Sequence, residues 1–230
     1  MNETKKRIIE ETARQQSYLI GNFNKPNANI VIPSWAAVSV SDPSFLSFIG
    51  KEIGNLIKNL ERVDLICGIS TTGISLAAAT SISTGIPWVF ARGERKSYGS
   101  KEAFDGTYHR GAHIIFVDNL SAKGKGMIPV FESAAEEGFI FSNLIVIVDY
   151  DKWLKVDQFK KHNVNVLSLI TVDELTDGLN ELGYFPGETY SYIKQFLKEP
   201  GEWNSESEKV KSFMSELEKY KDRPYIKILN

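Results

Sequence analysis

The chain has 230 residues, of which 42% are hydrophobic and 11% aromatic, enough to bury one substantial core with a smaller appendage. Its 27 basic and 29 acidic residues nearly cancel to a net charge of -2, and no stretch concentrates Lys and Arg, so we expect no nucleic-acid partner. Cys67 is the only cysteine, which excludes an internal disulfide and a thiolate metal cluster and fits a reducing cytosol.

The amino-terminal stretch, MNETKKRIIEETARQQ, is charged and lacks the apolar segment of a secretory signal, so we expect a cytoplasmic protein. The longest apolar run, Phe139 to Val148, is interrupted by Ser142 and Asn143 and is too short to cross a bilayer as a helix. No membrane partner is therefore expected. We assign residues 1–41 to an N-terminal helix and a small following segment.

From Asp42 onward, helix and strand signals alternate. Asp42 can cap a helix whose first turn contains Pro43. Short apolar, β-branched runs predict buried strands at residues 63–69, 88–91, 113–117, 144–148 and 164–169. Because helical segments lie between them, these runs predict an α/β fold with a five-stranded parallel sheet flanked by helices, to which we assign residues 42–175.

Residues 176–230 show a different pattern. Helix-like stretches around residues 190–197 and 206–220 are separated by the breaker Pro200-Gly201. The mixture of Glu and Lys in this region is typical of a solvated helix face. We therefore assign residues 176–230 to a helical C-terminal extension.

Parallel sheets bind ligands in the loops beyond the carboxyl ends of their strands. Three such loops stand out, at residues 68–73, 92–111 and 118–126. The middle loop is long, polar and punctuated by glycine, which favours a lid over a packed connection.

The third loop has the features of an anion site. The sequence IIFVDNLSAKGKG joins a buried strand to a glycine-containing loop and then to a helix near Met127. Backbone N–H groups exposed by Gly124 and Gly126, with the positive end of the helix, can surround a phosphate, and Lys123 and Lys125 add charge. A glycine turn with two solvated lysines is the competing interpretation. Candidate ligands for ribose hydroxyls and a 5′-phosphate are Asp118, Asn119, Ala122, Lys123, Gly124, Lys125 and Gly126.

This segment resembles the phosphoribosyl pyrophosphate signature of type I phosphoribosyltransferases, in which a strand runs into two acidic residues and a Thr/Gly-rich phosphate loop. The match is partial, because Asn119 stands at the second acid and Ala122 and Lys125 replace threonines. The resemblance continues upstream through DLICGISTTGISLAAATSISTGIPWVFARGERKSYG and is similar to the orotate branch, covering about residues 42–175. It implies the phosphoribosyltransferase fold, with residues before Asp42 forming a small hood over the base.

The resemblance also implies roles for individual residues. Arg92 and Lys96 fall on the basic residues that grip pyrophosphate during catalysis in the orotate branch. The turn that binds pyrophosphate corresponds to Ser70, Thr71, Thr72 and Gly73. Mg²⁺ would be held mainly by the substrate and water. The family implies a homodimer, because its catalytic loop completes the neighbouring subunit's site.

Several positions depart from the orotate branch. Thr72 and Gly93 each replace a lysine, and Tyr98 stands where the family loop has a histidine. Tyr150 replaces the arginine that engages the orotate carboxylate. Tyr150 is thus a candidate for stacking on a base or, alternatively, for packing in the core. Because tyrosine carries no positive charge, we predict that orotate is a poor substrate or none.

Other signatures are missing. The turn at Gly68 to Gly73 lacks the spacing of a nucleophilic serine elbow and of a dinucleotide-binding loop. His109, His113 and His162 show no metal-ligand spacing, so no protein-held metal is predicted.

Two functions remain open from the sequence. The leading hypothesis is an enzyme that transfers ribose 5-phosphate from phosphoribosyl pyrophosphate to a nitrogenous base. The alternative is a catalytically weak or inactive regulatory protein of the same fold that binds a nucleotide 5′-phosphate. Retention of Arg92, Lys96 and Asp118 favours the enzyme.

Overall fold

The computed structural model describes residues 2–22, 31–35, 40–92, 103–121, 127–150, 157–199, 203 and 207–228. The chain divides into two compact units, the first made of Met1–Ser39 with Thr171–Asn230 and the second of Val40–Ile170. The sequence suggested separate segments at residues 1–41 and 176–230, whereas the structure combines these two ends of the chain in one unit.

The second unit is built on a six-stranded sheet with the order β5-β4-β3-β6-β7-β8. Its strands are β3 (Leu65–Ile69), β4 (Trp88–Ala91), β5 (Phe104–Asp105), β6 (Ile114–Ser121), β7 (Asn143–Asp149) and β8 (Asn165–Thr171). Strand β3 is parallel to β4 and β6, and β6 is parallel to β7. All the predicted strands are present, and the predicted α/β class is confirmed.

Strand β5 corrects the predicted count from five strands to six. It pairs antiparallel with β4 at the edge of the sheet, so the sheet is mostly rather than wholly parallel. Phe104 anchors it, since its side chain is 1% exposed and its ring lies 5.2 Å from that of Phe139. A two-residue strand shows no alternation of apolar and polar residues, which is why the sequence does not reveal it.

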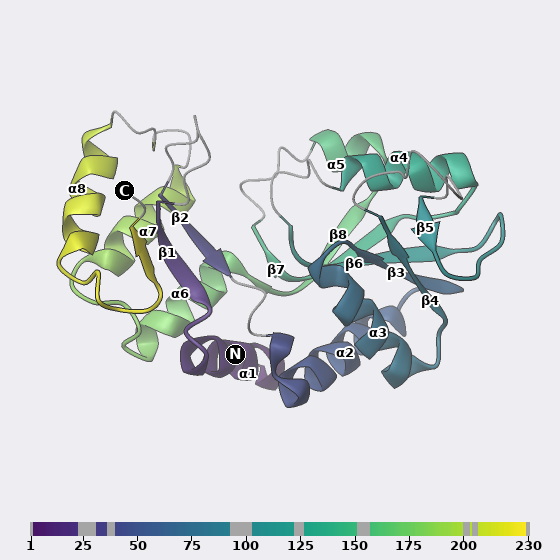
Figure 1. Ribbon diagram of the computed structural model, residues 1–230, viewed down its shortest axis with the longest axis horizontal. Coiled ribbons are helices and arrows are strands. Elements are labelled where there is room, and N and C mark those ends of the chain that lie inside the picture. Colours follow the sequence, from purple (N-terminus) through teal and green to yellow (C-terminus); the bar gives the residue numbers. More distant parts are fainter. Residues whose placement is uncertain are drawn as a thin grey trace. The chain divides into compact units, whose positions relative to one another are not determined.

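Helices cover both faces of this sheet (Figure 1). On one face lie α2 (Pro43–Ile57) and α3 (Thr72–Thr84), and on the other α4 (Ile128–Glu137) and α5 (Asp157–Lys161). Leu65, Cys67 and Ile69 of β3 join the buried cluster that contains Phe131 of α4. Cys67 is a free, buried thiol whose pKa is raised by burial, so it is not a reactive group.

The first unit contains its own small sheet, in which β1 (Tyr18–Asn22) lies between β2 (Val31–Trp35) and β9 (Ile226–Ile228). Strand β1 is antiparallel to β2 and parallel to β9, so the last strand pairs with the first. The helices of this unit are α1 (Glu3–Arg14), α6 (Val172–Glu181), α7 (Thr189–Lys198) and α8 (Glu208–Glu218). The predicted C-terminal helices are present, but this part of the chain ends in a strand that the sequence did not indicate.

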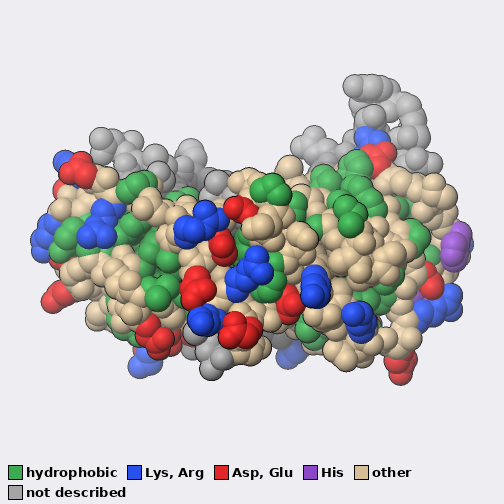
Figure 2. Space-filling model, turned by 90° about the horizontal axis from the view of Figure 1, so that it is seen from below, with side chains coloured by type: hydrophobic (Ala, Val, Ile, Leu, Met, Phe, Trp, Pro, Cys, Tyr) green, Lys and Arg blue, Asp and Glu red, His purple; other side chains and the backbone are tan. Residues whose placement is uncertain are grey.

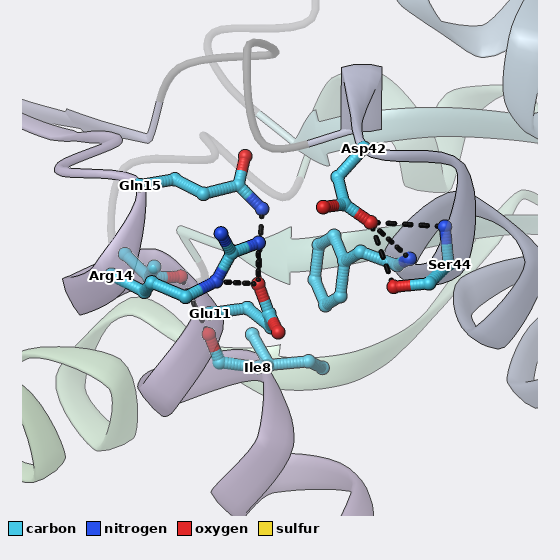
Figure 3. A network of polar contacts seen from close by, with 8 residues as sticks. Ile8, Glu11, Arg14, Gln15, Asp42 and Ser44 are labelled. Carbon is cyan, nitrogen blue, oxygen red and sulfur yellow. Dashed lines mark hydrogen bonds and ion pairs between the residues drawn. The ribbon is translucent and has the colours of Figure 1, made fainter.

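Local side-chain networks fix several helix ends, and Figure 3 shows one in each unit. In α1, Glu11 accepts hydrogen bonds from Arg14 at 2.9 and 2.6 Å and from Gln15 at 3.1 Å. At the start of α2, the Asp42 carboxylate accepts hydrogen bonds from the Ser44 amide at 2.9 Å and the Phe45 amide at 3.0 Å. The predicted cap at Asp42 is therefore confirmed.

Acidic and basic side chains are interspersed over the face shown in Figure 2 and do not gather into areas of one sign. Within the described ranges, no helix has the length and apolar composition needed to span a membrane.

Candidate functional site

The candidate site lies at the carboxyl ends of β4, β3, β6 and β7, where parallel strands direct their following loops to one edge of the sheet. The predicted site residues on this edge are Ser70, Thr71, Thr72, Gly73, Arg92, Asp118, Asn119 and Tyr150. The remaining predicted residues, Lys96, Ala122, Lys123, Gly124, Lys125 and Gly126, lie outside the described residues.

The turn after β3 is held against both neighbouring strands. The Ser70 hydroxyl donates a hydrogen bond to the Ala91 carbonyl at the end of β4, and the Ser70–Thr71 peptide bond is cis. A Cβ added at Gly73 would lie 2.3 Å from the Val117 carbonyl oxygen of β6. Only a glycine therefore allows α3 to begin this close to the strand that carries Asp118.

Asp118 lies inside β6, which continues to Ser121, whereas the sequence placed the end of the strand at Val117. Its carboxylate accepts a hydrogen bond from the Asn119 amide at 2.8 Å and also interacts with the Gly73 amide. Burial raises the pKa of Asp118 from 3.8 to about 7, although both amide contacts oppose the shift. This carboxyl group therefore titrates near neutral pH beside the start of α3.

Arg92 follows β4 directly. Its guanidinium forms an ion pair with Asp105 of β5, and its amide donates to the Ala103 carbonyl at 2.9 Å. The Arg92 Nε is buried and has no hydrogen-bond partner among the residues that the structure describes. Arg92 is thus retained at the edge of the sheet, but with part of its donor capacity already committed to a carboxylate of the same chain.

A third link joins the ends of β6 and β7. The fully buried Ser121 hydroxyl donates to the Asp149 carboxylate and accepts a hydrogen bond from the Tyr150 amide at 3.1 Å. Tyr150 is 4% exposed, so its ring offers little surface to a stacked base in this structure. This burial agrees with the packing interpretation of Tyr150.

Two helices begin at this edge without a capping side chain. The N-cap residues of α3 and α4, Thr71 and Met127, make no side-chain cap hydrogen bond, and neither first turn contains an acidic residue. In contrast, α2 of the same unit is capped by Asp42. The positive end of the helix dipole, with the first-turn amides other than that of Gly73, which Asp118 accepts, makes such N-termini favourable places for an anion.

The sequence missed two residues of this edge. Asp105 carries no local signal, because its role depends on pairing between β5 and β4. Ser121 was placed in the phosphate loop, yet it pairs with Asp149 as the last residue of β6. Leu120, just before it, is apolar, but a single apolar residue does not extend a strand prediction past the polar pair Asp118-Asn119.

The described residues contain no cluster of three or more His, Cys, Asp or Glu side chains able to hold a metal ion. Asp118 supplies carboxylate oxygens at this edge, a ligand type that Mg²⁺ accepts directly or through water. The edge therefore fits Mg²⁺ that takes most of its ligands from phosphate oxygens.

The arrangement, a mostly parallel sheet with α3 and α4 starting at the ends of β3 and β6, is that of the type I phosphoribosyltransferases. The chain matches no protein-family model. It is 28% identical over 146 residues to an orotate phosphoribosyltransferase of Malacoplasma penetrans, covering 63% of this chain and 70% of the relative. It is 25% identical over 210 residues to one of Listeria innocua, covering 85% of this chain and 98% of the relative.

Solved structures agree on the fold. The orotate phosphoribosyltransferase of Francisella tularensis superposes with a TM-score of 0.65 at 17% identity, covering 84% of this chain and 98% of that one. The UMP synthase of Leishmania donovani gives a TM-score of 0.75 at 17% identity, covering 85% of this chain but 42% of that one. The resemblance to type I phosphoribosyltransferases, and to the orotate phosphoribosyltransferases among them, is therefore confirmed.

Proposed function

We propose that this protein transfers ribose 5-phosphate from phosphoribosyl pyrophosphate to a ring nitrogen of a base and releases pyrophosphate. The observation that carries the proposal is the position of Asp118, which contacts the amide of Gly73 at the start of α3 and precedes the glycine-containing loop at residues 122–126. Relatives named orotate phosphoribosyltransferase match most of the chain and support it.

The substrate would be held through its two ends and its ribose. The Asp118 carboxylate has two acceptor oxygens, which suits the paired hydroxyls of a ribose. The amide of Thr72 at the start of α3 would bind the pyrophosphate, and the start of α4 with the loop before it would bind the 5′-phosphate. One extended anion would then span two helix N-termini with its ribose between them.

The chemistry would be electrostatic. As the bond from ribose to pyrophosphate breaks, negative charge grows on the leaving oxygens. Arg92 and Lys96 would stabilise that charge, and the largely buried setting of the Arg92 side chain, 20% exposed, strengthens such an interaction. Mg²⁺ would supply further neutralisation of the phosphate oxygens when it is bound with the substrate.

The base would bind near the ends of β6 and β7, where Ser121 links the Asp149 carboxylate to the Tyr150 amide. A carboxylate-bearing base requires a cation for a bidentate grip, and Tyr150 supplies none. We therefore expect orotate to be a poor substrate despite the names of the relatives. A homodimer in the cytosol completes the proposal, with the loop that carries Lys96 serving the neighbouring subunit.

The proposal is tested by titrating the protein with phosphoribosyl pyrophosphate and Mg²⁺ in a calorimeter, and then by a pyrophosphate-release assay over a panel of bases. We expect binding, release with at least one base and little release with orotate. Release with orotate at an ordinary enzymatic rate would contradict the assignment of Tyr150. Binding without release for any base would replace the enzyme with a binding protein of the same fold.

A further inference from the structure

The ion pair between Arg92 and Asp105 lies at the base of the segment that carries Lys96. Arg92 is the residue after β4 and Asp105 is in β5, and the two strands are antiparallel neighbours with Phe90 opposite Asp105. The Arg92 amide also donates to the Ala103 carbonyl at 2.9 Å. The two ends of the intervening segment are thus joined by a main-chain hydrogen bond and a charge pair.

This pair is largely removed from solvent. The side chains of Arg92 and Asp105 are 20% and 32% exposed, and the Arg92 Nε is buried with no hydrogen-bond partner in the described part of the chain. A guanidinium has five N–H donors and no acceptor, so its interactions are with acceptors such as carboxylates and phosphates. At this degree of burial, charge interactions are stronger than in open water.

The Arg92 guanidinium that would bind pyrophosphate already donates a hydrogen bond to Asp105 through Nη2. Arg92 is next in the chain to Ala91, whose carbonyl accepts the hydrogen bond from Ser70 of the pyrophosphate turn. An oxyanion bound at that turn would therefore lie near the Arg92 backbone and would draw the guanidinium away from Asp105. While the ion pair persists, the carboxylate cancels much of the positive charge that Arg92 would offer.

We propose, building on the proposed phosphoribosyl transfer, that Asp105 holds Arg92 in the ligand-free chain and lowers the affinity of the site for pyrophosphate. Binding of phosphoribosyl pyrophosphate then requires exchange of the Asp105 carboxylate for a phosphate oxygen. Asp105 thereby sets how tightly the leaving group is retained, which favours release of pyrophosphate after transfer.

The competing explanation is that the pair only fastens β5 to the edge of the sheet. In that case Asp105→Asn would lower the melting temperature and leave the affinity for pyrophosphate unchanged. The proposal predicts instead that Asp105→Asn, which keeps the size of the side chain and removes its charge, binds pyrophosphate more tightly.

The experiment is a double-mutant cycle with Asp105→Asn, Arg92→Ala and the combination, titrated with inorganic pyrophosphate and Mg²⁺. We expect Asp105→Asn to lower the dissociation constant for pyrophosphate by about three- to fivefold. This change corresponds to the strength of a partly exposed ion pair. Arg92→Ala should weaken binding, and adding Asp105→Asn to it should change little further. Asp105→Ala provides the same test if the asparagine variant does not fold.

Asp149→Asn is the charge control, because it removes another carboxylate from the same edge three strands away from β4. An equal gain in affinity from Asp149→Asn, or an undiminished gain in the Arg92→Ala background, would mean that general repulsion is responsible and would overturn the proposal. Unchanged or weaker binding in Asp105→Asn would also overturn it. Wild-type protein that binds neither pyrophosphate nor phosphoribosyl pyrophosphate contradicts the proposed function itself.

Discussion

The helices of the first unit and those at the carboxyl edge of the six-stranded sheet begin differently. In the first unit, Asn2 caps α1, Thr171 forms a capping box with Glu174 at α6, and Ser207 caps α8. The Glu188 amide at the start of α7 donates to the Glu216 carboxylate at 3.2 Å. At the sheet edge, the N-cap residues of α3 and α4 make no side-chain cap hydrogen bond.

Under the proposed function, this difference separates structural helix ends from ligand-binding ones. A side chain that accepts the first amides of a helix stabilises the helix but occupies the place of an anion. The acceptor that does reach α3 is Asp118, through the Gly73 amide, and it is the residue assigned to the ribose. The starts of α1, α6, α7 and α8 in the first unit are thus met by structural side chains, whereas at the sheet edge α3 is met by the residue proposed to bind ribose and α4 has no side-chain cap from its N-cap residue.

The largest expected effect comes from Gly73→Ala. Its new Cβ would lie 2.3 Å from the Val117 carbonyl oxygen, so α3 must move away from β6. We expect a loss of about 3 kcal/mol in the free energy of unfolding, the upper end for overpacking, and loss of phosphoribosyl pyrophosphate binding. Thermal unfolding and calorimetric titration of the folded fraction measure the two effects.

Gly178→Ala in the first unit is a matched control. Its Cβ would also lie 2.3 Å from another atom, but that atom is Cδ1 at the end of the Ile9 side chain and not a backbone oxygen. We expect a cost nearer about 1 kcal/mol and unchanged ligand affinity. If both variants lost ligand affinity equally, the distinction between the two regions would not hold.

Parts of this comparison were predictable from sequence because their causes are local. β4 was predicted to the residue, and Asp42 was identified as a cap from the Asp-Pro pair alone. Ser70 to Gly73, Arg92 and Asp118 were expected at one edge because parallel strands share the direction of their carboxyl ends. These inferences need only short windows of sequence and a general rule.

Other parts depend on contacts between distant residues. β6 continues to Ser121 because Leu120 and Ser121 pair with Val148 and Asp149 of β7. β9 exists because Ile226 pairs with Ile20 at the other end of the chain. No short window contains both partners of such a pair, so neither the last strand nor the roles of Asp105 and Ser121 could be inferred beforehand.

Asp118→Asn should have the next largest effect, and its size depends on pH. The pKa of Asp118 in the folded state is raised to about 7 from 3.8, so the free energy of unfolding of wild type decreases as pH rises through this interval. The Asp118→Asn variant should not show this decrease, because asparagine does not titrate. At pH 8, where the carboxylate is charged, the variant should bind phosphoribosyl pyrophosphate about 1–3 kcal/mol more weakly. Affinity of wild type should approach that of the variant as pH falls below about 7.

The comparison of wild type with Asp118→Asn at each pH cancels the titration of the ligand phosphates, which is common to both. Chemical unfolding curves and calorimetric titrations between pH 5 and pH 8, the range set by the shifted pKa, provide the data. A constant difference in affinity across the range would show that the charge of Asp118 is not what binds the ribose.

The smallest expected effects come from two threonines at helix starts, Thr171 and Thr71. Thr171 accepts a hydrogen bond from the Glu174 amide at 3.2 Å, so Thr171→Ala should lower the free energy of unfolding by about 1 kcal/mol and leave ligand affinity unchanged.

Thr71 is exposed and makes no cap hydrogen bond, so Thr71→Ala should change stability by less than about 0.5 kcal/mol. Its hydroxyl is free to donate to pyrophosphate, and its loss should weaken pyrophosphate binding by about 1 kcal/mol. Melting temperatures and pyrophosphate titrations of both variants give four values, and a stability loss at Thr71 with unchanged affinity would make the start of α3 a structural cap like that of α6.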